Sequence, residues 1–389
     1  MENQTKIRRY EFDWLRVLAF SLLIFYHTGM YFVEWEWHIK NPEISDAIEW
    51  PILFLSQWRM SLIFLVSGAG VYFALGYRSG GTFAKDRLKR ILLPLVAGML
   101  LVVPPQVYFE RVAQGYSGGY FSFYPSIFEL EPYPKGNFSW HHLWYLAYIF
   151  TYSLVLLPLL LFLRRATIGE KSIRAWVILI LPALWLSGGG VLLNERFPGT
   201  NALIDDWANH FLYVTIFLLG FVLMKLPELQ AKVRRIRWYS LAAALLTVTL
   251  LYVKYWMPDD VELAGAELDL YFIIKQSNRW FWLMTILGFA MQHLNIRSKY
   301  LATANEMVYP FYILHQTVIV TLGFYLRNAD WSIGSKFTFM SLATFLICFV
   351  LIRYVIMPVS WLRPLFGLKS ESKPVALSAP SNIPDAVSS

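Results

Sequence analysis

The sequence has little charge and almost no cysteine. Charged residues make up 15% of the 389 positions and hydrophobic residues 57%, whereas about a quarter of the residues in a soluble domain are charged. This composition excludes an ordinary soluble protein. The single cysteine, Cys348, excludes an internal disulfide and a metal centre built from several cysteines.

Long apolar segments are abundant instead. A helix needs about 20 residues to cross a bilayer, and ten segments approach or exceed that length. They are residues 14–33, 51–76, 91–109, 142–163, 175–193, 210–226, 238–256, 271–294, 307–326 and 336–358. We therefore predict an all-α fold, a polytopic membrane bundle of about ten transmembrane helices. No small-residue cleavage pattern follows the first span, so we expect it to be retained and not removed as a signal peptide.

The distribution of Lys and Arg predicts the orientation of the bundle. With the N-terminus in the cytoplasm, the cytoplasmic segments hold 22 of these residues and the opposite side only five. Lys and Arg accumulate on the cytoplasmic side of membrane proteins, so we expect both termini there. The net charge of +8 then reflects topology and attraction to anionic lipid, and it indicates no nucleic-acid partner.

The chain divides into two predicted parts. Residues 1–369 form the transmembrane domain, and residues 370–389, rich in Ser, Pro and Ala, form a disordered tail with no soluble domain after the bundle. The longest external loop, residues 110–141, is rich in Tyr, Phe, Gly and Pro. It either packs over the bundle as a substrate-contacting lid or is an interfacial aromatic loop.

Arg16 and His27, in the first span, are the most informative pair. Their separation of eleven residues amounts to three helical turns plus about 20°, so both lie on one face, roughly 16 Å apart along the axis. Ionisable groups inside a bilayer are costly and usually mark a polar cavity. His27 can act as a base toward a hydroxyl, and Arg16, near the cytoplasmic surface, can hold a phosphate or carboxylate. The alternatives are a structural histidine and an arginine that extends to lipid headgroups.

Four further basic residues lie at span ends. Arg59 lies near the external end of the second span, against the accumulation of Lys and Arg on the cytoplasmic side. We therefore expect it to have a partner such as a substrate or an acidic group. The alternative is a structural arginine at the interface. Arg87, Lys89 and Arg90 precede the third span. They suit the positive-inside rule alone, and they also suit a polyanionic nucleotide, because Arg pairs well with phosphate oxygens.

Two more histidines and a tryptophan lie inside or beside later spans. His142 and Trp144 lie where the fourth span leaves the external face, and His315 lies about 12 Å into the ninth span. Each has an alternative interpretation as a hydrogen-bonded aromatic neighbour. A metal site needs at least three converging ligands, which a sequence cannot show, and we predict no metal site.

Together these motifs resemble the acyltransferase 3 family of integral membrane acyltransferases. Arg16 and His27 match its first-helix signature of an arginine, ten residues and a histidine. The other matches, in the expected order within about residues 10–360, are residues 59–68, 87–94, 142–146 and 309–315. Members that succinylate periplasmic glucans look closest in length and in the segment Trp58-Arg59-Met60.

The resemblance implies a function and a site. An acetyl or succinyl group would pass from cytoplasmic acyl-CoA to a hydroxyl of an extracytoplasmic carbohydrate, namely a periplasmic glucan, lipopolysaccharide or exopolysaccharide. Acyl-CoA would be a co-substrate and no cofactor would stay bound; glycan-synthesis proteins are possible partners in a bacterial inner membrane. The implied residues are His27, Arg59 and His315 for catalysis, Arg16, Arg87, Lys89 and Arg90 for CoA, and His142 and Trp144 for the acceptor. Direct transfer and a covalent acyl-enzyme both remain open.

A transporter and a noncatalytic glycan-export subunit are the competing hypotheses. Intramembrane Arg and His can form a proton or substrate path. However, the sequence has no clearly mid-membrane carboxylate and no visible repeat between its halves, which favours the enzyme.

Overall fold

The computed structural model describes residues 9–167, 169, 173–258 and 261–370. Within these residues the chain is helical, and its only β-type contact is an isolated bridge between Pro132 and Phe138. The all-α prediction is therefore confirmed for the part of the chain that is described. The predicted disordered tail, residues 370–389, lies outside the described residues except for Ser370.

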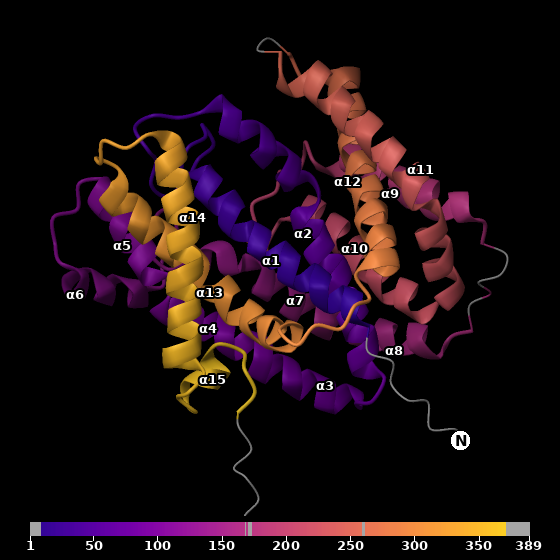
Figure 1. Ribbon diagram of the computed structural model, residues 1–389, viewed down its shortest axis with the longest axis horizontal. Helices are drawn as coiled ribbons and strands as arrows, with labels where there is room; N and C mark the ends of the chain where they lie inside the picture. The colour runs from indigo at the N-terminus through magenta and orange to yellow at the C-terminus, as the bar shows by residue number, and fades with distance from the viewer. Residues whose placement is uncertain (1–8, 168, 170–172, 259–260, 371–389) are drawn as a thin grey trace, which may run out of the picture.

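The helices follow the predicted spans closely (Figure 1). Segments η1, η4 and η5 are π-helical, and η2 and η3 are 3₁₀-helical. The elements are α1 Tyr10–Met30, α2 Asp46–Leu75, α3 Gly80–Arg87, η1 Leu88–Leu92, α4 Leu93–Leu101, α5 Pro104–Ala113, α6 Tyr120–Phe123, η2 Tyr124–Glu129, η3 His141–Leu143, α7 Trp144–Val155, α8 Leu157–Arg165, α9 Ala175–Leu193, α10 Trp207–Lys225, α11 Pro227–Leu251, η4 Tyr252–Trp256, α12 Gly265–His293, α13 Leu301–Leu326, α14 Ile333–Val350, η5 Leu351–Ile356 and α15 Leu362–Leu365.

Each of the ten predicted spans contains helix, but fewer helices qualify as spans. By length and composition, seven helices of the described chain can cross a membrane, or eight if the pair α7–α8 forms one span. This pair bends by 57° at Leu156, just before Pro158, where a proline disrupts helix geometry. Helices α1 and α12 are not among the seven; both carry several charged residues, which lower their mean hydropathy. The protein is thus a multi-pass membrane protein, and the ten-span topology with cytoplasmic termini stays a prediction.

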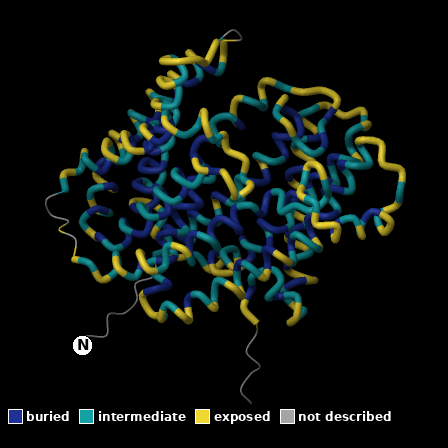
Figure 2. Tube along the Cα trace, turned by 180° about the vertical axis from the view of Figure 1, so that it is seen from behind, coloured by how far each residue is buried: buried dark blue, intermediate teal, exposed yellow. Residues whose placement is uncertain are grey.

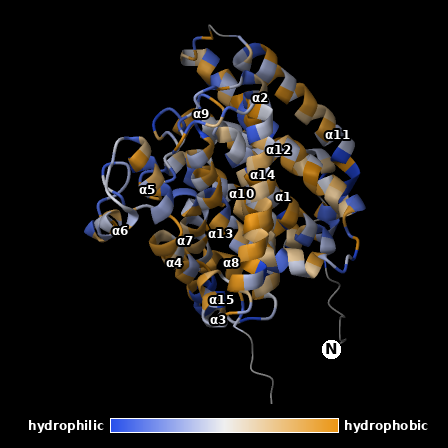
Figure 3. Cartoon of the chain, turned by 60° about the vertical axis from the view of Figure 1, so that its left-hand side comes forward, coloured by the Kyte–Doolittle hydropathy of each residue, from blue (hydrophilic) through white to orange (hydrophobic). Residues whose placement is uncertain are grey.

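Burial separates a central helix from the peripheral ones. The most apolar 18-residue stretch of α2 is 72% buried, whereas the corresponding stretch of α11 is 28% buried. Figure 1 shows α1, α2 and α10 in the middle, with α13 and α14 on one side and α9, α11 and α12 on the other. Buried residues accordingly gather inside the bundle and exposed ones around it (Figure 2). Hydrophobic residues nevertheless run along the peripheral α14 (Figure 3), as expected for a helix that faces lipid.

Two glycines allow α2 and α10 to pack closely. A Cβ atom on Gly68 would lie 1.9 Å from the carbonyl oxygen of Phe217, and one on Gly220 would lie 2.1 Å from that of Leu65. Any side chain at either position would therefore force the two backbones apart. This contact fixes α2, which carries Arg59, against the rest of the bundle.

The loop between α1 and α2 is held by Lys40. Its amine donates hydrogen bonds to the carbonyl oxygens of Met30, at 3.0 Å, and Trp35, at 2.6 Å, and also to that of Val33. One carbonyl group at the end of α1, that of Met30, and two in the loop are thereby satisfied. Burial lowers the pKa of the Lys40 amine. The ordered loop places Trp37 and His38 beside the end of α1.

Candidate acyl-transfer site

Three of the predicted CoA-binding residues line one cavity. It has a volume of about 310 Å³, and Arg16 of α1, Arg87 of α3 and Arg90 of η1 all face it. Nη1 of Arg16 donates a hydrogen bond to Oδ1 of Asn305 at 3.1 Å and lies 3.9 Å from the Asp13 carboxylate. The cavity therefore combines three guanidinium groups with a lining that is otherwise mostly apolar.

Lys89 does not join these residues. It is exposed, and it does not line the cavity. Arg87 and Arg90 are separated by three positions and share a helical face, whereas Lys89 lies off that face. The structure thus groups Arg87 and Arg90 with Arg16 and separates Lys89 from them.

The cavity ends at aromatic rings before it reaches His27. Phe20 and Tyr145 line it. The centroid of the Phe20 ring lies 6.4 Å from that of the Tyr145 ring and 5.3 Å from that of the Tyr312 ring. The hydroxyl of Tyr145 is 2.5 Å from Oγ of Ser67. His27 lies seven residues beyond Phe20 on α1, about 10 Å further along the helix axis. A ligand that joined the two regions would pass these rings.

His27 and His315 form a hydrogen-bonded pair. Nδ1 of His27 is 2.8 Å from Nε2 of His315, and Nδ1 of His315 is 2.7 Å from the carbonyl oxygen of Tyr312. This carbonyl can only accept, so Nδ1 of His315 carries its proton and the Nε2 of a neutral ring must accept from His27. His27 is then protonated at Nδ1, and its Nε2 retains a lone pair.

Stacking fixes the orientation of the His27 ring. The Trp37 ring stacks on it with a centroid distance of 5.3 Å, and the hydrogen-bonded His315 ring lies beside it, with an angle of 15° between the two ring planes. Trp37 was not predicted as a site residue, because a loop tryptophan carries no sequence signal of this contact.

His142 supports the pair from the side, and Trp144 does not. The His142 ring meets His315 edge-on at 5.2 Å, and its Nε2 donates to the carbonyl oxygen of Ile313 at 3.0 Å. Trp144 packs instead among Phe64, Tyr148 and Tyr213. The structure therefore brings His142, but not Trp144, to the histidine pair.

Arg59 is a buried cation beside the same site. It is 5% exposed, and its Cζ atom lies 3.3 Å from the ring centroid of Tyr26, the neighbour of His27 in sequence. Its Nε and Nη1 atoms have no hydrogen-bond partner within the described residues. Unpaired buried donors are costly, so these two atoms are suited to an anionic group that enters the site.

The fold and the site define a class: a multi-pass helical membrane protein with a histidine pair in its interior and a basic cavity at one end of the same helix. Residues 9–353 match the family described as an acyltransferase domain, acyltransferase family 3. The chain belongs to this family and is an acyltransferase, as the sequence motifs predicted.

Similar proteins are known from several strains of Escherichia coli. Glucans biosynthesis protein C of strain SMS-3-5 is 21% identical over 345 residues, which cover 83% of this chain and 86% of that protein. The proteins of the same name from strain K12 and from O157:H7 give the same identity and coverage. The similarity to proteins with this name agrees with the predicted resemblance to the glucan-modifying subgroup.

Proposed function

We propose that the protein transfers an acyl group from cytoplasmic acyl-CoA to a hydroxyl of an extracytoplasmic carbohydrate. One observation carries this proposal: the hydrogen-bond chain from Tyr312 through His315 leaves His27 with a free Nε2, on the helix that also presents Arg16 to the basic cavity. A base and an anion-binding cavity on one helix suit a reaction between substrates that arrive from opposite sides.

In the proposed reaction, CoA phosphates bind to Arg16, Arg87 and Arg90, and the pantetheine arm extends past Phe20 toward His27. Nε2 of His27 takes the proton of the acceptor hydroxyl while the oxygen of that hydroxyl attacks the thioester carbonyl. Arg59 stabilises the negative oxygen of the tetrahedral intermediate. The intermediate then breaks its carbon–sulfur bond, and the CoA thiolate takes the proton from His27. The ester is left on the carbohydrate.

The acyl group in this proposal is acetyl or succinyl, and the acceptor is a periplasmic glucan, lipopolysaccharide or exopolysaccharide. The relatives' name favours a glucan. The proposal also includes a bacterial inner membrane as the location, lipid and glycan-synthesis proteins as partners, and acyl-CoA as a co-substrate.

Mass spectrometry of envelope glycans, with and without the gene, tests this proposal. We expect one acyl mass on one glycan class to disappear when the gene is deleted and to return with the wild-type gene. Unchanged glycans would contradict the proposed acceptor. Purified protein should also release free CoA when acyl-CoA and glycan are supplied together; counterflow in sealed vesicles without CoA release would support a transporter instead.

Replacement of cavity arginines should weaken CoA binding. A hydrogen bond to a charged group contributes about 1.5–3 kcal/mol, so Arg16→Ala or Arg87→Ala should each raise the Kd for CoA about tenfold or more. Isothermal titration of CoA into purified protein measures this effect. Lys89→Ala is the matched control, because Lys89 lies outside the cavity. An equal loss in all three variants would point to attraction by the basic surface and not to the cavity.

His315 should act as a positioning residue. His315→Ala should lower kcat about tenfold to a hundredfold with little change in KM, because the proton of His27 is no longer held on Nδ1. His315→Gln, whose side-chain oxygen can accept that hydrogen bond, should restore part of the rate. Steady-state kinetics of CoA release compare the variants. A purely structural role predicts lower yield of folded protein with unchanged kcat in the folded fraction.

A further inference from the structure

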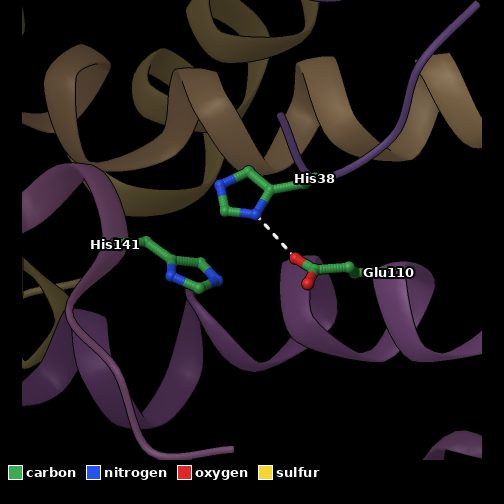
Figure 4. Close-up of side chains that lie close together, drawn as sticks. All are labelled: His38, Glu110 and His141. Atoms are coloured by element: carbon green, nitrogen blue, oxygen red, sulfur yellow. Dashed lines mark hydrogen bonds and ion pairs between the residues drawn. The ribbon is translucent and has the colours of Figure 1, made fainter. Parts of the chain in front are cut away.

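A second cluster of polar side chains lies next to the His27 site. It consists of His38 from the α1–α2 loop, Glu110 from α5 and His141 from η3, with one ligand atom of each within 4.8 Å of the others. Figure 4 shows the ring of His141 pointing toward Glu110, with His38 above them. The proposed acyl transfer uses none of these residues.

The cluster offers donor atoms of the kinds that metal ions bind, now joined by a hydrogen bond that a shared ion would replace. Nδ1 of His38 is 2.7 Å from Oε2 of Glu110. Nδ1 of His141 lies 2.8 Å from Oγ of Ser139, which leaves Nε2 of His141 buried without a hydrogen-bond partner within the described residues. An orphaned buried nitrogen is costly, and a metal ion would satisfy it.

Neighbouring side chains hold the ligands in place, as outer-shell partners do in metal sites. Oε1 of Glu110 accepts a hydrogen bond from the Tyr133 hydroxyl at 2.8 Å. The Tyr133 hydroxyl is the donor in this contact, because a carboxylate can only accept. The side-chain nitrogen of Gln316 donates to Nε2 of His38 at 3.0 Å, so Nδ1 of His38 carries a proton and donates it to Glu110. An ion on Nδ1 replaces that proton, and the Gln316 amide then presents its oxygen to Nε2. These contacts leave Oε2 of Glu110 and Nδ1 of His38 facing His141.

The backbone of His141 is also unusual. Its φ angle is 41°, in the left-handed region that residues other than glycine rarely adopt. Such strain persists only where the surrounding structure maintains it, and it concentrates at functional sites. This backbone conformation directs the His141 ring toward His38, while the ring of the next residue, His142, packs against His315.

We propose that His38, Glu110 and His141 bind a zinc ion. Two imidazoles and one carboxylate, with a fourth position open, form the donor set of many catalytic zinc sites. The positive charge of Arg111, which follows Glu110, disfavours a nearby cation. However, its guanidinium is hydrogen-bonded to Asn137 and to the carbonyl oxygens of Pro134 and Gly136. The open position accommodates water or a hydroxyl group. The site also adjoins His27, because Trp37 packs against both His27 and His38.

Metal content of the purified protein tests this proposal independently of acyl transfer. The protein is purified in detergent through a tag without histidine, incubated with zinc, desalted and analysed by mass spectrometry of metals. We expect about one zinc per chain in the wild type, and a large loss in His141→Ala and Glu110→Gln. The matched controls His293→Ala and Glu129→Gln change exposed residues and should retain the ion.

Replacement of zinc by cobalt gives a second readout on the wild-type protein alone, which remains valid if the variants fold poorly. We expect visible absorption bands typical of a four-coordinate site. Zinc far below one per chain in the wild type would overturn the proposal. So would zinc retained in folded His141→Ala and Glu110→Gln, because the ion would then lie elsewhere.

Discussion

His27→Ala is expected to lower the rate of acyl transfer by about 10²–10⁴-fold, the usual contribution of a positioned general base. The replacement removes the free Nε2 that takes the acceptor's proton in the proposed reaction. Affinity for CoA should change little, because His27 does not line the basic cavity. Release of CoA thiol by purified protein, with acyl-CoA and glycan present, measures the rate.

The matched control is His293→Ala, which removes an exposed histidine at the end of α12. It should keep wild-type activity. Elution of each variant as a single species in detergent shows that it is folded. Near-normal turnover in folded His27→Ala would reject His27 as the base.

Arg59→Gln is expected to have the second large effect, a loss of about 10²–10³ in kcat. The unpaired Nε and Nη1 atoms of Arg59 are the donors that the intermediate's oxygen would use. Arg59→Lys keeps the charge but loses the planar arrangement of donors, so its rate should lie between those of the wild type and the glutamine variant. Single-turnover and steady-state kinetics separate the acyl-transfer step from substrate binding.

Arg279→Gln provides a comparison with a partly buried arginine. Nε of Arg279 donates to the carbonyl oxygen of Gln57 at 2.7 Å, and its Nη1 atom binds the Gln276 side chain. These internal partners indicate a structural role, so the variant should unfold at a lower temperature while its folded fraction keeps its kcat. If Arg59→Gln behaved in the same way, Arg59 would be structural too.

Sequence patterns predicted most of the helices because a long apolar segment needs no partner to be identified. The ten predicted segments contain helix at their predicted positions. Helical spacing predicted that Arg16 and His27 share one face of α1, and the structure has Arg16, but not His27, lining the basic cavity. The order of motifs led to the correct family. The number of spans was less predictable, because helices such as α1 and α12 combine apolar and charged residues.

The contacts of the site were harder to predict because they join distant parts of the chain. His27 and His315 are 288 positions apart, and their hydrogen bond follows from the packing of α1 against α13. The His38, Glu110 and His141 cluster needs three separate elements to converge, so the sequence prediction of no metal site could not take it into account. Conversely, Lys89 and Trp144 lie within the matched motifs, yet Lys89 does not line the cavity and Trp144 packs among other aromatic rings.

A structure of the protein with a stable thioether analogue of acyl-CoA, determined by electron cryomicroscopy, tests the central claim most directly. The account predicts phosphate density among Arg16, Arg87 and Arg90, displaced rings at Phe20 or Tyr145, and the acyl end within reach of Nε2 of His27. An analogue bound outside this cavity, or a sulfur atom that remains on the cavity side of the undisplaced rings, would contradict it.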